Sequence, residues 1–111
     1  MRVCVLSSGS KGNCSYIETS NHKILIDIGN SSAYVERSLR SIGVDASEID
    51  MILISHAHVD HIAGLRVFSK KYNPKVYMTE KIFKESGLNI SNVYDIVETK
   101  GNNPIIPKLL K

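Results

Sequence analysis

The chain has 111 residues and a mass of 12.3 kDa, which allows one small domain with a thin hydrophobic core. Its composition, 42% hydrophobic and 23% charged, excludes a disordered chain. No apolar run approaches the roughly 20 residues that cross a bilayer, and the first residues lack a signal-peptide pattern, so we expect a cytoplasmic protein without a membrane segment. The net charge of +3 is too small to indicate nucleic-acid binding by itself.

The first 30 residues contain three short apolar segments separated by turn-forming residues, a pattern typical of strands. Gly9 and Gly12 lie in the first turn, which lacks the pattern of a phosphate-binding loop and precedes no helical segment. The second turn predicts a hairpin, with His22 as a solvated turn residue. We expect these strands at residues 2–6, which we take to be buried, 14–19 and 23–28.

The next segment predicts a crossover between parallel strands. Apolar residues recur at helical spacing over residues 31–43, and Gly43 ends the pattern, which predicts a helix capped by serine at its start. Residues 51–54 form an apolar run typical of a buried strand. The order strand, helix, strand favours a right-handed connection in a mixed sheet. We therefore assign the chain to the α/β class.

In the last third of the chain, the alternation of predicted strands and helices continues but is less clear. One helix is expected from His61 to about Tyr72, and the small residues Ala63 and Gly64 near its start allow a close approach of backbone. We then expect a strand at 75–78, a short helix at 80–86 and an edge strand at 93–97. Two prolines and the lack of a period predict an irregular tail at residues 100–111, after a folded unit at residues 1–99.

Three histidines and an aspartate lie within six positions, directly after the strand at residues 51–54. His56 and His58 are two apart on an extended backbone and point to the same side, so both can bind one cation. Asp60 and His61 fall in the first turn of the following helix, where they can form a second site nearby. Two adjacent metal ions can activate a water molecule and stabilise both the attacking and the leaving oxygen of a displacement.

A purely structural interpretation makes these histidines hydrogen-bonding groups at a strand end and Asp60 the N-cap of the helix. It is the weaker one, because each of four clustered polar groups costs desolvation free energy unless it has a partner. Asp27 also interrupts an apolar strand, just before Gly29, and its carboxylate must be satisfied. It can accept backbone N–H groups, or it can orient an imidazole that binds the metal.

The pattern HxHxDH at residues 56–61 resembles the metal-binding signature of the metallo-beta-lactamase superfamily. SSGSxGNC at residues 7–14 and LIDxG at residues 25–29 resemble its WalJ-like branch of DNA exonucleases. The similarity extends from residue 3 to about residue 80. It implies a four-layer αββα sandwich, of which this chain would form the N-terminal half as a mixed sheet with helices.

The resemblance also implies roles for individual residues. His56 and His58 would bind one metal ion, and Asp60 and His61 the other. Asp60 would also be the catalytic residue that handles a proton, and Asp27 would support the site by hydrogen bonding to a ligand. The implied cofactors are two divalent ions, Zn²⁺ first and Mn²⁺ as the alternative. The implied reaction is metal-dependent hydrolysis of phosphodiester bonds in DNA.

The family's later metal ligands have no counterpart here. They comprise two further histidines and a bridging aspartate, whereas no histidine follows His61 and Asp95 is the only later aspartate. We therefore expect a truncated chain with low metal occupancy and weak or no activity, because each ion keeps two protein ligands where zinc normally has three or four. Strands that face the family's second sheet should leave an apolar surface, which favours self-association.

Two alternatives stay open at this point. The chain could be a non-catalytic folded fragment that forms a homo-oligomer or pairs with a complementary chain carrying the missing ligands. It could also belong to a hydrolase of small esters, thioesters or lactams, because the same activated water serves that chemistry and the metal motif does not distinguish the substrates. Only the resemblance of the glycine-rich opening favours the nuclease.

Overall fold

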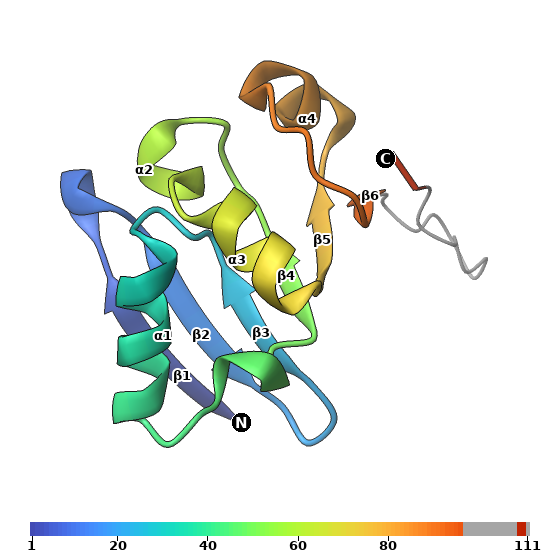
Figure 1. Cartoon of the computed structure of the whole chain (residues 1–111). Coiled ribbons are helices and arrows are strands. Elements are labelled where there is room, and N and C mark those ends of the chain that lie inside the picture. Colours follow the sequence, from blue (N-terminus) through green and yellow to red (C-terminus); the bar gives the residue numbers. More distant parts are fainter. Residues whose placement is uncertain (97–108, 111) are drawn as a thin grey trace.

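The computed structural model describes residues 1–96 and 109–110, which form a six-stranded mixed sheet with helices packed on one face (Figure 1). The strands lie in the sheet in their sequence order. They are β1 (Arg2–Ser7), β2 (Cys14–Glu18), β3 (Lys23–Ile26), β4 (Met51–Leu53), β5 (Lys75–Met78) and β6 (Val93–Asp95). The helices are α1 (Ser32–Ser41), α2 (Val59–Ile62), α3 (Leu65–Tyr72) and α4 (Glu80–Ser86), with 3₁₀ turns η1 (Gly9–Lys11) and η2 (Ala46–Glu48).

The sheet combines an antiparallel hairpin with a parallel half. Strands β1, β2 and β3 pair antiparallel, whereas β3, β4, β5 and β6 pair parallel. This arrangement confirms the predicted hairpin and the α/β class. The helix α1 connects β3 to β4, and α3 precedes β5. Because β3 and β4 are parallel, the residues that follow them emerge at the same edge of the sheet.

One row of side chains across the sheet points toward the helices and forms the core. Its members occupy paired positions on neighbouring strands, and those on β2 to β6 have no exposed surface. Val35 and Leu39 of α1, with Leu65 and Phe68 of α3, belong to the same buried cluster. The completely buried sheet residues of this row include Tyr16, Leu25, Ile52 and Val76.

No element within residues 1–96 and 109–110 covers the opposite face of the sheet to the same extent. Leu53 and Tyr77, which are paired neighbours there, are only partly buried. Val3 and Val5 on β1 are 59% and 68% exposed. The prediction that residues 2–6 form a buried strand is therefore wrong. An apolar run does not distinguish a central strand from an edge strand whose alternate side chains point to an open face.

The segment after the histidine cluster forms two helices where the sequence predicted one. The break lies at Gly64, whose N–H donates to the Ile28 carbonyl at 3.0 Å and not to the preceding helical turn. The close backbone approach predicted here is present, because a side chain on Gly64 would meet the Asn30 carbonyl oxygen. The predicted end of the last strand, at residue 97, lies outside the described residues. The predicted boundary between the folded unit and the tail, at residues 99–100, also lies outside them. None of the described helices is long and apolar enough to span a membrane.

Candidate metal centre

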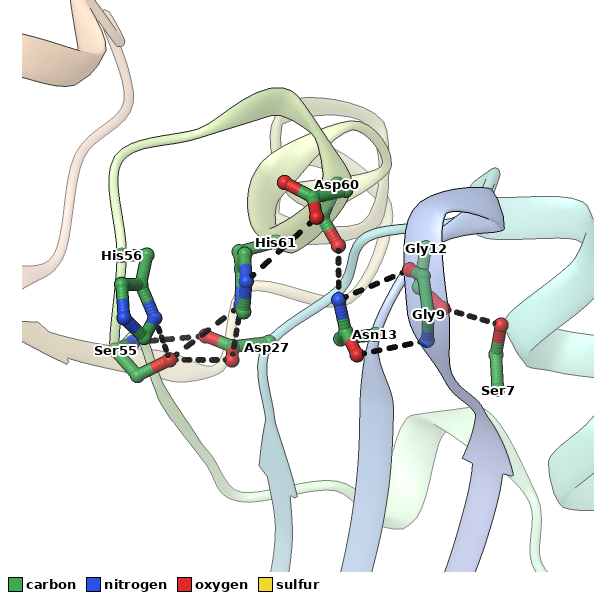
Figure 2. Close-up of polar contacts among 9 residues, drawn as sticks. All are labelled: Ser7, Gly9, Gly12, Asn13, Asp27, Ser55, His56, Asp60 and His61. Carbon is green, nitrogen blue, oxygen red and sulfur yellow. Dashed lines mark hydrogen bonds and ion pairs between the residues drawn. The ribbon is translucent and has the colours of Figure 1, made fainter.

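The predicted site residues lie at the edge of the sheet where β3 and β4 end (Figure 2). Asp27 directly follows β3, and its N–H donates to the Leu53 carbonyl at 2.8 Å. The histidine segment begins three residues after Leu53 and turns into α2. The parallel pairing of β3 with β4 therefore brings an aspartate and a histidine cluster together, although they are about 30 residues apart in sequence.

Asp27 is the buried centre of this group, with 4% of its surface exposed. Its carboxylate accepts three hydrogen bonds: from the Ser55 N–H at 2.8 Å, the Ser55 hydroxyl at 2.6 Å and His61 Nδ1 at 2.7 Å. Asp27 therefore accepts a backbone N–H and also contacts an imidazole, whereas the binding of a metal by that imidazole stays a prediction. Its φ of 65° is left-handed, a conformation that aspartate tolerates better than most residues.

His61 is held in one orientation by this carboxylate. A proton on Nδ1 completes the bond to Asp27 and leaves Nε2 with a free lone pair, which is the tautomer that binds a metal through Nε2. Nε2 lies 3.9 Å from Oδ2 of Asp60. Asp60 is one-third exposed and His61 less so, which means that both donor atoms adjoin solvent at the end of the sheet.

The other two histidines are more exposed. The ring of His56 lies 4.4 Å from that of His61 and 6.4 Å from that of His58, measured between centroids. His56 Nδ1 is 2.8 Å from the Ser55 hydroxyl. His58 occupies the N-cap position of α2 and makes no side-chain capping hydrogen bond. The interpretation of Asp60 as the helix N-cap is therefore wrong, because Asp60 lies within the helix.

The donors that meet here suit a divalent cation. Asp27, His56 and His61 each place one possible ligand atom within 4.8 Å of the others. Imidazole nitrogens beside a carboxylate oxygen are typical ligands of zinc and related ions. The Asp27 oxygens also accept three hydrogen bonds from the protein. That Asp27 orients His61 without itself binding an ion stays a prediction.

Two residues of the site were not predicted to contribute to it. Ser55 links Asp27 to His56 through its hydroxyl, and Asn13 donates to the main chain of Asp60. A serine directly before the histidine cluster is the signal that could have identified the first. Asn13 lies in the glycine-rich turn. The sequence of that turn resembles a branch of the family, but the resemblance did not indicate a contact with Asp60.

Cys14 lies near this edge of the sheet but is not a candidate ligand. Its side chain is buried, with 1% of the residue exposed. Burial, with a smaller contribution from the charge of Asp27, raises the pKa of the thiol to about 12. Metal ions bind the thiolate form of cysteine. The neutral thiol of Cys14 therefore acts as a small apolar group of the core.

Comparison with known proteins identifies the family of this chain. The sequence model of the metallo-beta-lactamase superfamily matches residues 8–108. The chain is similar to "Exodeoxyribonuclease WalJ" of Streptococcus pneumoniae, with 41% identity over 83 residues, or 75% of this chain and 31% of that protein. It is also similar to "Exodeoxyribonuclease YycJ" of Bacillus anthracis, with 37% identity over 84% of this chain and 35% of the relative. The chain thus spans about a third of the length of these relatives.

Solved structures share the fold at lower identity. MEM-A1, a subclass B3 metallo-beta-lactamase from a soil metagenome library, superimposes with a TM-score of 0.68 and 19% identity, over 81% of this chain and 42% of that one. The metallo-beta-lactamase SMB-1 gives a TM-score of 0.67 with 18% identity, over 82% of this chain and 42% of that one. These structures show that the fold is shared. Because the family model covers most of the chain, the chain belongs to the metallo-beta-lactamase superfamily.

Proposed function

We propose that this chain carries the first metal-binding segment of a metal-dependent phosphodiesterase that removes nucleotides from DNA ends. The observation that carries the proposal is the buried Asp27 carboxylate, which orients His61 so that Nε2 faces Asp60. This pair lies inside the HxHxDH motif at residues 56–61. The similarity to two exodeoxyribonucleases supports DNA as the substrate class.

In this proposal His56 and His58 hold one divalent ion, and Asp60 and His61 hold the other. Zn²⁺ is the first candidate and Mn²⁺ the alternative, because imidazole suits the former and carboxylate suits both. When bound, the ions supply Lewis-acid activation of water and positive charge for the leaving oxygen. The protein's own contribution is orientation: Asp27 fixes the His61 tautomer, and the Asp60 carboxylate is placed to accept a proton.

The remaining ligands of such a site come, in this proposal, from residues that are not part of these 111. The activity proposed for the whole protein therefore requires this segment to pack against a further one. A second candidate function follows from the open sheet face: the folded segment is not itself catalytic and pairs with a complementary chain or with a second copy. Val5, which is 68% exposed on that face, supports this alternative.

The test is an activity assay with matched histidine variants of the 111-residue chain. The chain is purified without chelator, its metal content is measured by plasma mass spectrometry, and end-labelled DNA, nitrocefin and a glutathione thioester are offered in parallel. The proposal predicts bound metal that His61→Ala removes and His22→Ala leaves unchanged. Because the remaining ligands lie outside these 111 residues, it predicts weak or no cleavage by the chain alone. Once a segment that carries those ligands is added, it predicts cleavage of DNA in preference to the two small substrates.

Light scattering separates the two candidate functions. A monomer that cleaves DNA would contradict the pairing hypothesis. A dimer of the 111-residue chain that cleaves no substrate would favour it. A chain whose metal content equals that of His61→Ala would contradict the proposed site. Faster turnover of nitrocefin or thioester than of DNA would replace the nuclease by a small-substrate hydrolase.

A further inference from the structure

We propose that Asn13 is a positioning residue that holds the Asp60 and His61 pair in place through the main chain of α2. The inference rests on the proposed metal site for its purpose. Its geometry stands on the hydrogen bonds among Gly9, Asn13 and Asp60 (Figure 2).

Two carbonyl groups of α2, those of Asp60 and His61, accept hydrogen bonds from residues next to β2 and β3 and not from the next helical turn. The Asp60 carbonyl accepts the Asn13 N–H at 2.7 Å and the Asn13 side-chain amide at 3.3 Å. The His61 carbonyl accepts the Ile28 N–H at 2.9 Å. Helix α2 therefore ends after one turn, and its main chain is fixed to the ends of the β2–β3 hairpin at both metal-binding residues.

The side chain of Asn13 is itself held by the glycine-rich turn. Its Oδ1 accepts the Gly9 N–H at 3.1 Å, and its Nδ2 donates to the Gly9 carbonyl at 3.2 Å. These two bonds form a closed pair that sets the amide plane, so that Nδ2 can also reach the Asp60 carbonyl. The polar groups of Gly9 are thereby engaged internally, which gives the turn a structural use other than binding a phosphate.

Glycines allow the main chain of Asp60 to lie directly on this turn. A side chain on Gly29 would come within 1.7 Å of the Asp60 carbonyl oxygen and 2.4 Å of the Asn13 nitrogen. A side chain on Gly12 would come within 2.4 Å of the Gly29 carbonyl oxygen. Three layers of backbone thus pack without side chains between them, and Asn13 provides the only side-chain donor to the Asp60 carbonyl among the described hydrogen bonds.

Loss of this donor should move Asp60 relative to Nε2 of His61 while the fold persists, because the bond from the Asn13 N–H remains. Substitution of a residue that hydrogen-bonds to a metal ligand typically lowers metal affinity by about 10- to 100-fold. Since Asn13 acts through the main chain of a ligand and not on its side chain, we expect the lower end of that range, about tenfold.

The test compares Asn13→Asp with Asn30→Ala in the 111-residue chain. Asn13→Asp keeps the shape and the acceptor for the Gly9 N–H but loses the donors to the Gly9 and Asp60 carbonyls. Asn30→Ala is the matched control, because its Nδ2 donates to the Lys11 carbonyl in the same turn but makes no bond to Asp60. Asn13→Ala is the second variant, in case the added charge disturbs folding.

Two readouts are taken: the Co²⁺ titration followed by visible absorption, and NMR amide exchange of Ile28 in the metal-free chain. The Ile28 N–H is bonded to the His61 carbonyl and therefore reports on how firmly α2 is held. We expect about tenfold weaker Co²⁺ binding and about tenfold faster exchange in both Asn13 variants, with Asn30→Ala unchanged. Fold retention is checked by the thermal unfolding midpoint.

The outcomes separate this inference from the proposed function. Equal Co²⁺ affinity and equal Ile28 exchange in the Asn13 variants and Asn30→Ala would overturn the role of Asn13 and leave the metal site intact. A wild-type chain that binds no Co²⁺ would overturn the proposed site. In that case faster Ile28 exchange in the Asn13 variants alone still supports the positioning of α2, and unchanged exchange overturns it.

Discussion

A histidine paired with an aspartate occurs at each end of the sheet, and the two pairs differ in their surroundings. At the carboxyl ends of β3 and β4, His61 Nδ1 lies 2.7 Å from Asp27, with side chains 17% and 6% exposed. At the opposite end, His22 Nδ1 lies 3.0 Å from Asp50, with side chains 51% and 43% exposed. The distances are similar, so the contact between the two residue types does not by itself mark a functional site.

The difference lies in what else surrounds the carboxylate. Asp27 also accepts two hydrogen bonds from Ser55, and the main chain that carries His61 is bonded to Ile28. His22 lies in a hairpin turn that Thr19 stabilises through its hydroxyl. A buried pair interacts through less solvent and is costly to break, whereas an exposed pair is screened. The four predictions that follow test this contrast, from the largest expected effect to the smallest.

The largest effect is expected from Gly29→Ala, at the site end. The new methyl group would lie 1.7 Å from the Asp60 carbonyl oxygen, so the backbone layers must separate. We expect a loss of more than about 3 kcal/mol in the free energy of unfolding. Gly43→Ala, toward the opposite end, is the control: its φ is +80° but no atom lies within 4 Å, so about 1 kcal/mol of backbone strain is expected.

Urea unfolding followed by circular dichroism measures both glycine variants. Equal losses would mean that backbone packing at the site end is no tighter than elsewhere, which would remove the structural basis for a preformed site.

The second prediction exchanges the two carboxylates for amides. Asp27→Asn weakens the acceptor that orients His61, and we expect metal affinity to fall by about 10- to 100-fold. Asp50→Asn makes the same chemical change beside His22 and should leave metal affinity unchanged. Isothermal titration with Zn²⁺ compares the two. If Asp50→Asn weakens binding as much as Asp27→Asn, the observed binding belongs to scattered surface histidines and not to this site.

Much of this arrangement follows from sequence patterns. Apolar runs and turn residues predicted the hairpin and the parallel half, and parallel strands place their following residues at one edge. The expectation that Asp27 supports a metal ligand came from the family resemblance, and the parallel pairing of β3 with β4 explains why Asp27 meets His61. Residues 2–6 were misjudged because burial depends on whether an element covers a face of the sheet, which a five-residue pattern does not encode.

Other parts of the site depend on contacts that periodicity does not describe. The break between α2 and α3 arises because hydrogen bonds from Asn13 and Ile28 replace those of a continuing helix. Ser55 contributes through a hydroxyl that reaches two partners on different segments. The division of the ligands into one pair for each ion stays a prediction. The described contacts instead group His56 with His61 and Asp27.

The third prediction concerns Glu36, whose burial lies between those of Asp27 and Asp50. Lys71, at 2.7 Å, and the Tyr72 hydroxyl both donate to it and lower the pKa of its carboxyl group. A carboxylate with a lowered pKa stabilises the fold above its unfolded pKa of about 4.3 and loses that contribution as the pH falls through the lowered value. Glu36→Gln should therefore cost about 1 kcal/mol at pH 7 and almost nothing in acid.

Urea unfolding of wild type and Glu36→Gln across the acidic range measures this difference. Glu80→Gln serves as the control, because Glu80 pairs with Lys84 on the surface at 3.3 Å and should show little change at any pH. A cost at Glu36 that does not vary with pH would show that packing, and not the charge, is what Glu36 contributes.

The smallest effect is expected for the exposed pair itself. A double-mutant cycle on His22 and Asp50 should give a coupling of about 0.5 kcal/mol that disappears in molar salt, because both side chains are screened by water. The same cycle on His61 and Asp27 should give a coupling of at least about 1.5 kcal/mol that salt changes little. Equal couplings would mean that burial does not strengthen the pair at the site end, and the contrast between the two ends would lose its energetic basis.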